Sequence, residues 1–146
     1  MIIAIGADHG GYLLKEELIN SFEGEIEFKD FGTISTESVN YPEFAFNVAE
    51  SVSKGECESG VLICKSGIGM CIAANKVKNI RCAKISTMKE ARLCKEHNDV
   101  NVVALAAEEL TAEAAKELVY MWLSSEFKGG RHQNRVDLIS EYENRN

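Results

Sequence analysis

The sequence predicts a single-domain α/β fold with a doubly wound, Rossmann-like architecture, in which a five-stranded parallel sheet is flanked by helices. Short apolar runs alternate with amphipathic helical patterns along the chain, and this alternation is typical of parallel strands joined by crossover helices. The 146 residues, 45% of them hydrophobic, are about one domain in length and can bury a substantial core. We therefore expect one domain over residues 1–146, with no linker, repeat or low-complexity tract.

The first half of the chain predicts three strands and two helices. An apolar run begins at the N-terminus, and the aliphatic residues that follow it recur at helical spacing. A polar segment precedes Tyr41-Pro42, which opens the second helix because proline is tolerated in a first turn. The expected strands span residues 2–7, 26–30 and 61–64, the first helix spans 11–22, and the polar segment spans 32–40.

The second half of the chain continues the same alternation. Thr111 is a suitable N-cap for a long helix that runs through Trp122, and a final amphipathic helix is expected after a turn at 128–132. The expected strands span residues 81–85 and 102–105, and the other expected helices span 68–76, 88–96 and 134–143.

Charge and the N-terminal sequence argue against several classes of protein. With 23 acidic and 16 basic residues the net charge is −7, so no chain-wide field attracts nucleic acid or an anionic membrane. The chain enters a strand at once, and no apolar run approaches the roughly 20 residues that span a bilayer. We expect a cytoplasmic protein that binds neither nucleic acid nor a membrane.

The five cysteines predict neither a disulfide framework nor a metal site. Their number is odd, their positions are irregular, and no pair forms a Cys-x-x-Cys motif. The three histidines are scattered along the chain. The expected role for most of these cysteines is that of a small buried hydrophobic residue.

Cys64 is the exception because of its position. The apolar run from Gly60 ends at this residue and breaks into the glycine-rich turn Ser66–Met70. A cysteine at the start of a helix feels the positive end of the helix dipole, which favours its thiolate form. Gly67 and Gly69 leave backbone amides exposed, and these amides suit a phosphate, a carboxylate or a developing oxyanion. The alternative is that this segment is only a tight turn between a strand and a helix. A dinucleotide-binding site is not indicated, because two glycines alone do not make its fingerprint.

Polar residues follow two expected strands at the place where a doubly wound sheet binds its ligands, beyond the carboxyl ends of the strands. Asp8 and His9 follow the first strand, and the Cys64 turn follows the third. The polar segment 97–99 lies just before the fifth strand instead. Its side chains must therefore reach any shared site from the end of the preceding helix.

Taken together, the motifs of this chain resemble the ribose-5-phosphate isomerase B family, which also contains galactose-6-phosphate isomerases. The resemblance covers nearly the full length. Its motifs are Asp8-His9-Gly10-Gly11, Asn40-Tyr41-Pro42, Leu62-Ile63-Cys64 with Ser66-Gly67-Ile68-Gly69-Met70, Ile72-Ala73-Ala74-Asn75-Lys76, Glu96-His97-Asn98-Asp99, and Gly129-Gly130-Arg131-His132 through Arg135.

The resemblance implies an aldose–ketose isomerisation of a phosphorylated sugar, first of all ribose 5-phosphate to ribulose 5-phosphate in the pentose phosphate pathway. The reaction passes through a cis-enediolate and needs no metal or organic cofactor. Cys64 is the implied base, and Ser66 passes a proton between the two oxygens. His97 opens the sugar ring, and Asp8 accepts hydrogen bonds from sugar hydroxyls.

The resemblance also implies which residues bind the substrate. The phosphate is bound by His9, Arg131 and Arg135, because the forked guanidinium group of an arginine matches the phosphate oxygens. Asn98 and the loop amides hold the enediolate charge. The implied substrate-binding residues are His9, Tyr41, Gly67, Ile68, Gly69, Met70, Asn98, Arg131 and Arg135. The family further implies a homodimer or homotetramer with shared active sites, in which the neighbouring subunit supplies the arginines.

Three positions depart from the family's pattern. Lys65 stands where members usually have glycine, and Glu108 stands where many carry an arginine. The segment 86–89 replaces one that usually contains a tyrosine. A hexose 6-phosphate or a tetrose phosphate is therefore an alternative substrate.

The sequence is also compatible with functions other than isomerisation and with structural roles for the candidate residues. A non-catalytic sugar-phosphate-binding protein would keep the fold. A cysteine phosphatase would need an arginine at the end of the loop, where Met70 and Cys71 stand. Asp8 would suit a helix cap, and the two arginines would suit surface ion pairs with Asp137 and Glu141. His132 is not included in the expected site.

Overall fold

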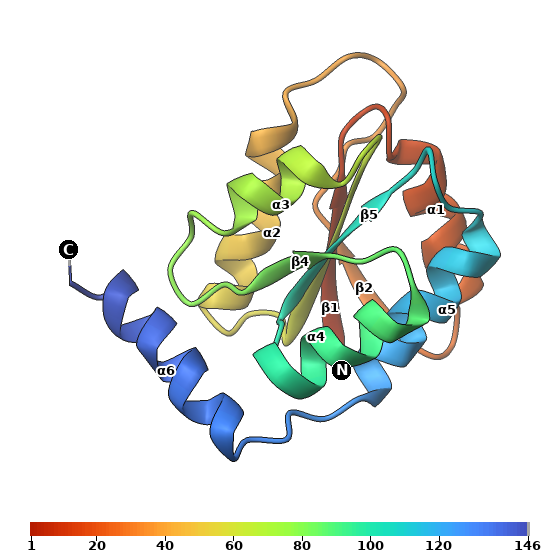
Figure 1. Ribbon diagram of the computed structural model, residues 1–146. Helices are drawn as coiled ribbons and strands as arrows, with labels where there is room; N and C mark the ends of the chain where they lie inside the picture. Colours follow the sequence, from red (N-terminus) through yellow and green to blue (C-terminus); the bar gives the residue numbers. More distant parts are fainter. Residues whose placement is uncertain (146) are drawn as a thin grey trace.

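A five-stranded parallel sheet forms the centre of the computed structural model, which describes residues 1–145 (Figure 1). The strands stand in the order β2-β1-β3-β5-β4, and every neighbouring pair is parallel. They span Ile2–Ala7 (β1), Glu27–Asp30 (β2), Ser59–Cys64 (β3), Cys82–Lys84 (β4) and Val102–Ala106 (β5). The chain order reverses between β1 and β3, so the predicted doubly wound fold is confirmed.

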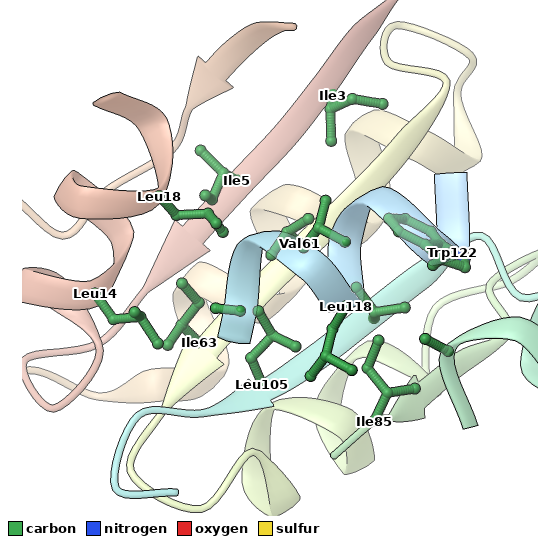
Figure 2. Packing of buried hydrophobic residues seen from close by; sticks show 14 of the residues in the cluster. Ile3, Ile5, Leu14, Leu18, Val61, Ile63, Ile85, Leu105, Leu118 and Trp122 are labelled. Carbon is green, nitrogen blue, oxygen red and sulfur yellow. The ribbon is translucent and has the colours of Figure 1, made fainter. Parts of the chain in front are cut away.

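Helices cover both faces of this sheet. They span Tyr12–Ser21 (α1), Tyr41–Ser53 (α2), Ile68–Ala74 (α3), Met88–Asn98 (α4), Ala112–Ser124 (α5) and Arg131–Glu143 (α6). Buried side chains form one cluster with α1, α4 and α5, and a second cluster with α2 and α3. Figure 2 shows the first cluster, in which Leu18 of α1 and Trp122 of α5 lie against the strands. Within residues 1–145, none of the helices has the length and apolar character needed to cross a bilayer.

The alternation of side chains along β3 decides which face of the sheet receives Cys64. Val61 and Ile63 belong to the cluster under α1, α4 and α5, whereas Leu62 and Cys64 belong to the cluster under α2 and α3. Successive side chains of a strand point to opposite faces of the sheet, so residues 61 and 63 face one side and residues 62 and 64 face the other. Cys64 therefore lies at the carboxyl end of β3, on the α2 and α3 face and next to the β1–β3 reversal.

The predicted strands and helices are all present with small displacements of their ends, but the start predicted for the last helix is wrong. That helix, α6, begins at Arg131 and not at Asn134. Gly129 and Gly130 have φ angles of 61° and 55° and complete the turn by themselves. The amide of His132 already donates to the carbonyl of Gly129 over 3.0 Å, so Arg131 and His132 belong to the helix.

The C-terminal helix α6 lies outside both helix layers and meets them at the end of α4, where the strands of the sheet begin (Figure 1). Near its end, a carboxylate oxygen of Glu143 accepts the amide of Asn79, which precedes β4. Large apolar side chains on α6 stay exposed: Leu138 is 62% exposed and Tyr142 is 68% exposed. A single chain therefore leaves part of this helix uncovered.

Candidate active site

Cys64 lies beneath the tight turn that joins β3 to α3. Its side chain is buried, and its sulfur accepts a hydrogen bond from the amide of Gly67 at 3.2 Å. Gly67 has a φ of 75°, which favours glycine, and a side chain there would meet the backbone carbonyl carbon of Leu105 at 3.2 Å. The turn thus wraps closely around the sulfur and points one N–H donor at it.

The amides that begin α3 differ in what they are free to bind. The Gly67 amide is committed to the Cys64 sulfur, and the Ile68 amide donates to the hydroxyl of Ser66 over 3.2 Å. The amides of Gly69 and Met70 lie in the first turn of the helix, where no carbonyl four residues earlier can accept them. They are the two donors of the loop best placed for an anionic ligand.

Tyr41 lies directly against this loop, although it comes from the start of α2. A Cβ atom at Gly69 would lie 2.6 Å from a ring carbon of Tyr41. Only glycine lets the aromatic ring approach the loop backbone so closely. The predicted residues Tyr41 and Gly69 are therefore brought together by the fold.

Asp8 and His9 lie beyond the end of β1, beside the turn that follows β3. One carboxylate oxygen of Asp8 accepts the amides of Gly10 at 2.9 Å and Gly11 at 3.2 Å. Asp8 thus orders the approach to α1 without being its N-cap, which is Gly11. The Nδ1 atom of His9 accepts the amide of Val39 over 3.2 Å, so a neutral His9 carries its proton on Nε2 and keeps it as a donor.

Four predicted residues lie at the opposite end of the sheet. The helix α4 starts beyond the carboxyl end of β4 and runs back, so His97 and Asn98 lie where β5 begins. Arg131 and Arg135 lie on α6, at the same end of the sheet (Figure 1). A strand of five or six residues is about 17 to 20 Å long, and this length separates the two groups. One chain alone does not bring them together.

His132 is a residue that the sequence interpretation missed. The residue is 9% exposed, and its ring stacks on that of His97, with ring centroids 4.3 Å apart and an angle of 13° between the planes. The chain before α6 is tied to the end of α4, because the amide of Lys128 donates to the carbonyl of Glu96 over 3.0 Å. The stack therefore fixes the orientation of His97 relative to α6.

The environment of His132 predicts a pH-dependent stability. Burial lowers the pKa of His132 below 6.5, and the positive charges of His97, Arg131, Arg135 and Lys128 lower it further. An unfolded chain regains a pKa near 6.5. The contribution of neutral His132 to the free energy of unfolding is therefore complete above about pH 6.5. It is lost as the pH falls through the lowered pKa of His132 in the folded state.

We expect the urea midpoint of the protein to fall between pH 7 and pH 5, and His132→Gln to reduce this fall because its side chain does not titrate. Equilibrium unfolding of both proteins at the two pH values measures the difference. An equally steep fall in the variant would assign the pH dependence to other groups.

Two departures from the family's pattern, Lys65 and Glu108, are neighbours in space. The amide of Glu108 donates to the carbonyl of Lys65 over 3.1 Å, and both side chains are exposed. The stem of Lys65 lies against Gly10, since a Cβ atom there would be 2.5 Å from Cγ of Lys65. The loop after β3 therefore carries a positive side chain, Lys65, and the neighbouring loop after β5 carries a negative one, Glu108.

Comparison with known sequences assigns the chain to a family. A sequence model described as Ribose/Galactose Isomerase matches residues 3–139. The chain belongs to this family. Ribose-5-phosphate isomerase B of Escherichia coli is 43% identical over 144 residues, which cover 98% of this chain and 97% of that protein. D-erythrulose-4-phosphate isomerase of Pectobacterium atrosepticum is 36% identical over 97% of this chain and 94% of its own length.

Solved structures agree with this assignment. Ribose-5-phosphate isomerase B of Clostridium thermocellum is similar with a TM-score of 0.96 and 47% identity, over 98% of this chain and 97% of the other. The Mycoplasma genitalium enzyme with bound ribulose-5-phosphate has a TM-score of 0.94 and 36% identity, over 99% and 97% of the two chains. The predicted family and fold are confirmed, and the chain is an enzyme of the aldose–ketose isomerase type.

Proposed function

We propose that this protein converts ribose 5-phosphate to ribulose 5-phosphate through a cis-enediolate, with Cys64 as the base. The observation that carries the proposal is the buried Cys64 sulfur beneath a loop whose Gly69 and Met70 amides are free. Membership of the family supports the reaction type, and the names of the Escherichia coli and Mycoplasma genitalium relatives support the substrate.

The chemistry divides among the residues at the carboxyl end of the sheet. The Cys64 thiolate removes the proton from C2 of the open-chain sugar and returns it to C1. The negative charge that develops on the two oxygens is held by the amides of Gly69 and Met70, with the Ser66 hydroxyl passing a proton between these oxygens. Hydrogen moves only within the substrate, so this route requires neither a metal ion nor an organic cofactor.

The remaining roles fall to the residues at the other end of the sheet, supplied by a second copy of the chain. His97 gives and takes the proton that opens the furanose ring, and Asn98 adds a donor to the enediolate. Arg131 and Arg135 bind the phosphate together with His9, whose Nε2 proton is free. The exposed apolar side chains of α6 support a second copy as the occupant of that surface. We propose a homodimer or homotetramer with active sites shared between copies.

A substrate panel tests this function directly. Purified protein is incubated with ribose 5-phosphate, with a tetrose phosphate and with a hexose 6-phosphate, and ketose formation is followed. We expect the highest kcat/KM with ribose 5-phosphate. A preference for the tetrose phosphate would favour the activity for which the Pectobacterium relative is named. Turnover of none of the three would contradict the isomerase assignment and favour a sugar-phosphate-binding role.

Lys65 provides a test of substrate preference. Lys65 directly follows the proposed base in the sequence, and its exposed side chain adds a positive charge to this loop, which favours an anionic substrate. We expect Lys65→Met, which keeps the stem against Gly10, to raise KM for ribose 5-phosphate about three- to tenfold with little change in kcat, as loss of about 1 kcal/mol implies. Kinetics at low and high salt measure this effect, which should shrink as salt screens the charge.

The matched substitution is Glu108→Arg, which restores the charge that many family members carry. If either Lys65→Gly or Glu108→Arg instead raises kcat/KM for ribose 5-phosphate by more than about tenfold, or 1.4 kcal/mol, then these positions adapt the enzyme to another sugar phosphate. The tetrose and hexose phosphates would then be assayed with the same variants.

A further inference from the structure

Two cysteines outside the proposed active site lie together between α3 and β4. Cys71 is on α3 and Cys82 is the first residue of β4, and both pack against the buried cluster under α2 and α3. The Cys71 thiol donates to the backbone carbonyl of Cys82 over 3.4 Å. Both residues are free cysteines.

Asn75 holds this contact in place. Its side-chain oxygen accepts the amide of Cys82 at 2.8 Å, and its side-chain nitrogen donates to the carbonyl of Cys82 at 2.9 Å. The same nitrogen lies 3.7 Å from the sulfur of Cys71. The C-cap residue of α3 therefore fixes the backbone of Cys82 beside the Cys71 side chain.

The two thiols are chemically unequal. The neighbouring Cys82 side chain lowers the pKa of Cys71 to about 7, although burial acts in the opposite direction. The Cys71 side chain, together with burial, raises the pKa of Cys82 well above 9.0. Cys71 is also partly exposed. A partly exposed thiolate beside a second thiol is the arrangement found in redox-sensitive cysteine pairs.

We propose that Cys71 and Cys82 form a peroxide-sensitive pair that closes to a disulfide between α3 and β4, separate from Cys64. The Cys71 thiolate attacks one oxygen of hydrogen peroxide, and the O–O bond breaks to leave a sulfenic acid on Cys71 and a hydroxide that is protonated to water. The Cys82 sulfur then attacks the Cys71 sulfur, and the hydroxyl group leaves with the Cys82 proton as a second water. Two thiols are oxidised, and one peroxide is reduced to two waters.

Trypsin distinguishes this pair from the other cysteines of the chain. Cleavage after lysine and arginine leaves Cys71 in peptide 66–76, Cys82 in peptide 82–84 and Cys94 in peptide 93–95, while the remaining two cysteines share peptide 55–65. The reduced full-length protein is treated with hydrogen peroxide, its remaining thiols are alkylated, and the digest is analysed by mass spectrometry without reductant.

We expect peptides 66–76 and 82–84 to appear joined by a disulfide, before peptide 55–65 loses its alkylated form. The linked species should disappear on addition of a reductant. Burial raises the pKa of Cys94 to about 11, so peptide 93–95 should stay alkylated at least about tenfold longer. This readout is a mass, so it holds whichever sugar phosphate the enzyme turns over.

Two variants make the result specific. Cys82→Ser removes the second sulfur, so the linked peptide should vanish and a sulfenic acid on Cys71 should be trapped by dimedone. Cys94→Ser, the matched control, should leave the linked peptide unchanged. Oxidation of Cys64 while Cys71 and Cys82 remain alkylated would overturn the proposal, as would a disulfide that joins Cys82 to Cys94.

Discussion

Replacing Cys64 with alanine should lower kcat for ribose 5-phosphate by at least about a hundredfold, the usual effect of removing a general base. The substitution takes away the sulfur that accepts the Gly67 amide, in the loop whose Gly69 and Met70 amides are free. It leaves these amides and the side chains proposed to bind the phosphate in place, so KM should change much less than kcat. Steady-state kinetics across a range of substrate concentrations separate the two parameters.

Two further variants show whether this loss is chemical. Cys64→Ser keeps the shape of the side chain but replaces the thiol with a much weaker acid, so its kcat should be as low as that of Cys64→Ala. Cys57→Ala removes another buried thiol from the same cluster, far from the carboxyl end of β3, and should retain near-normal kcat. Near-normal turnover by Cys64→Ala would move the base to another residue.

The fold could be predicted from the sequence because its signals are local. Each strand is a short apolar run, and each crossover helix has its own stripe of buried residues. The alternation along β3 also assigns Cys64 to one face, since the period of a strand is two. The start of α6 was not predictable in the same way. Two successive glycines with positive φ complete the turn early, and the sequence does not show which conformation a glycine adopts.

The grouping of the residues near Cys64 could likewise be predicted, because Asp8, His9 and the loop all follow strand ends that meet at the β1–β3 reversal. The finer geometry depends on tertiary contacts. The donation from the Gly67 amide to the Cys64 sulfur requires the left-handed conformation of Gly67. The stack of His132 on His97 requires α6 to lie against the end of α4. No local pattern indicates either contact.

The separation of the two groups of polar residues constrains how this chain can act. Cys64 and Asp8 lie at the carboxyl end of the sheet, whereas His97 and Arg131 lie at the opposite end. No rotation of side chains spans a distance of about 17 Å. If both groups serve one reaction, the second group must come from another copy. In a two-fold symmetric dimer each copy then gives one group to each of two equivalent sites.

This geometry makes a quantitative prediction for mixed assemblies. Cys64→Ala and Arg131→Ala should each be nearly inactive alone. When the two chains are unfolded together and refolded, about half of the dimers contain one copy of each. Every mixed dimer has one site that carries both defects and one site that carries neither. Activity should therefore rise to about a quarter of that of the unmodified protein assembled at the same chain concentration.

The matched control is a mixture of Cys64→Ala with Asp8→Ala. Both substitutions lie in the same group of residues at the carboxyl end, so each site of a mixed dimer carries one defect and no activity should be recovered. Recovery in the first mixture and none in the second requires that Cys64 and Arg131 reach a given site from different chains. If the first mixture shows only the average of its two components, each site is built within one chain. Arg131 would then have to act from the far end of its own sheet, which the placement of α6 opposes.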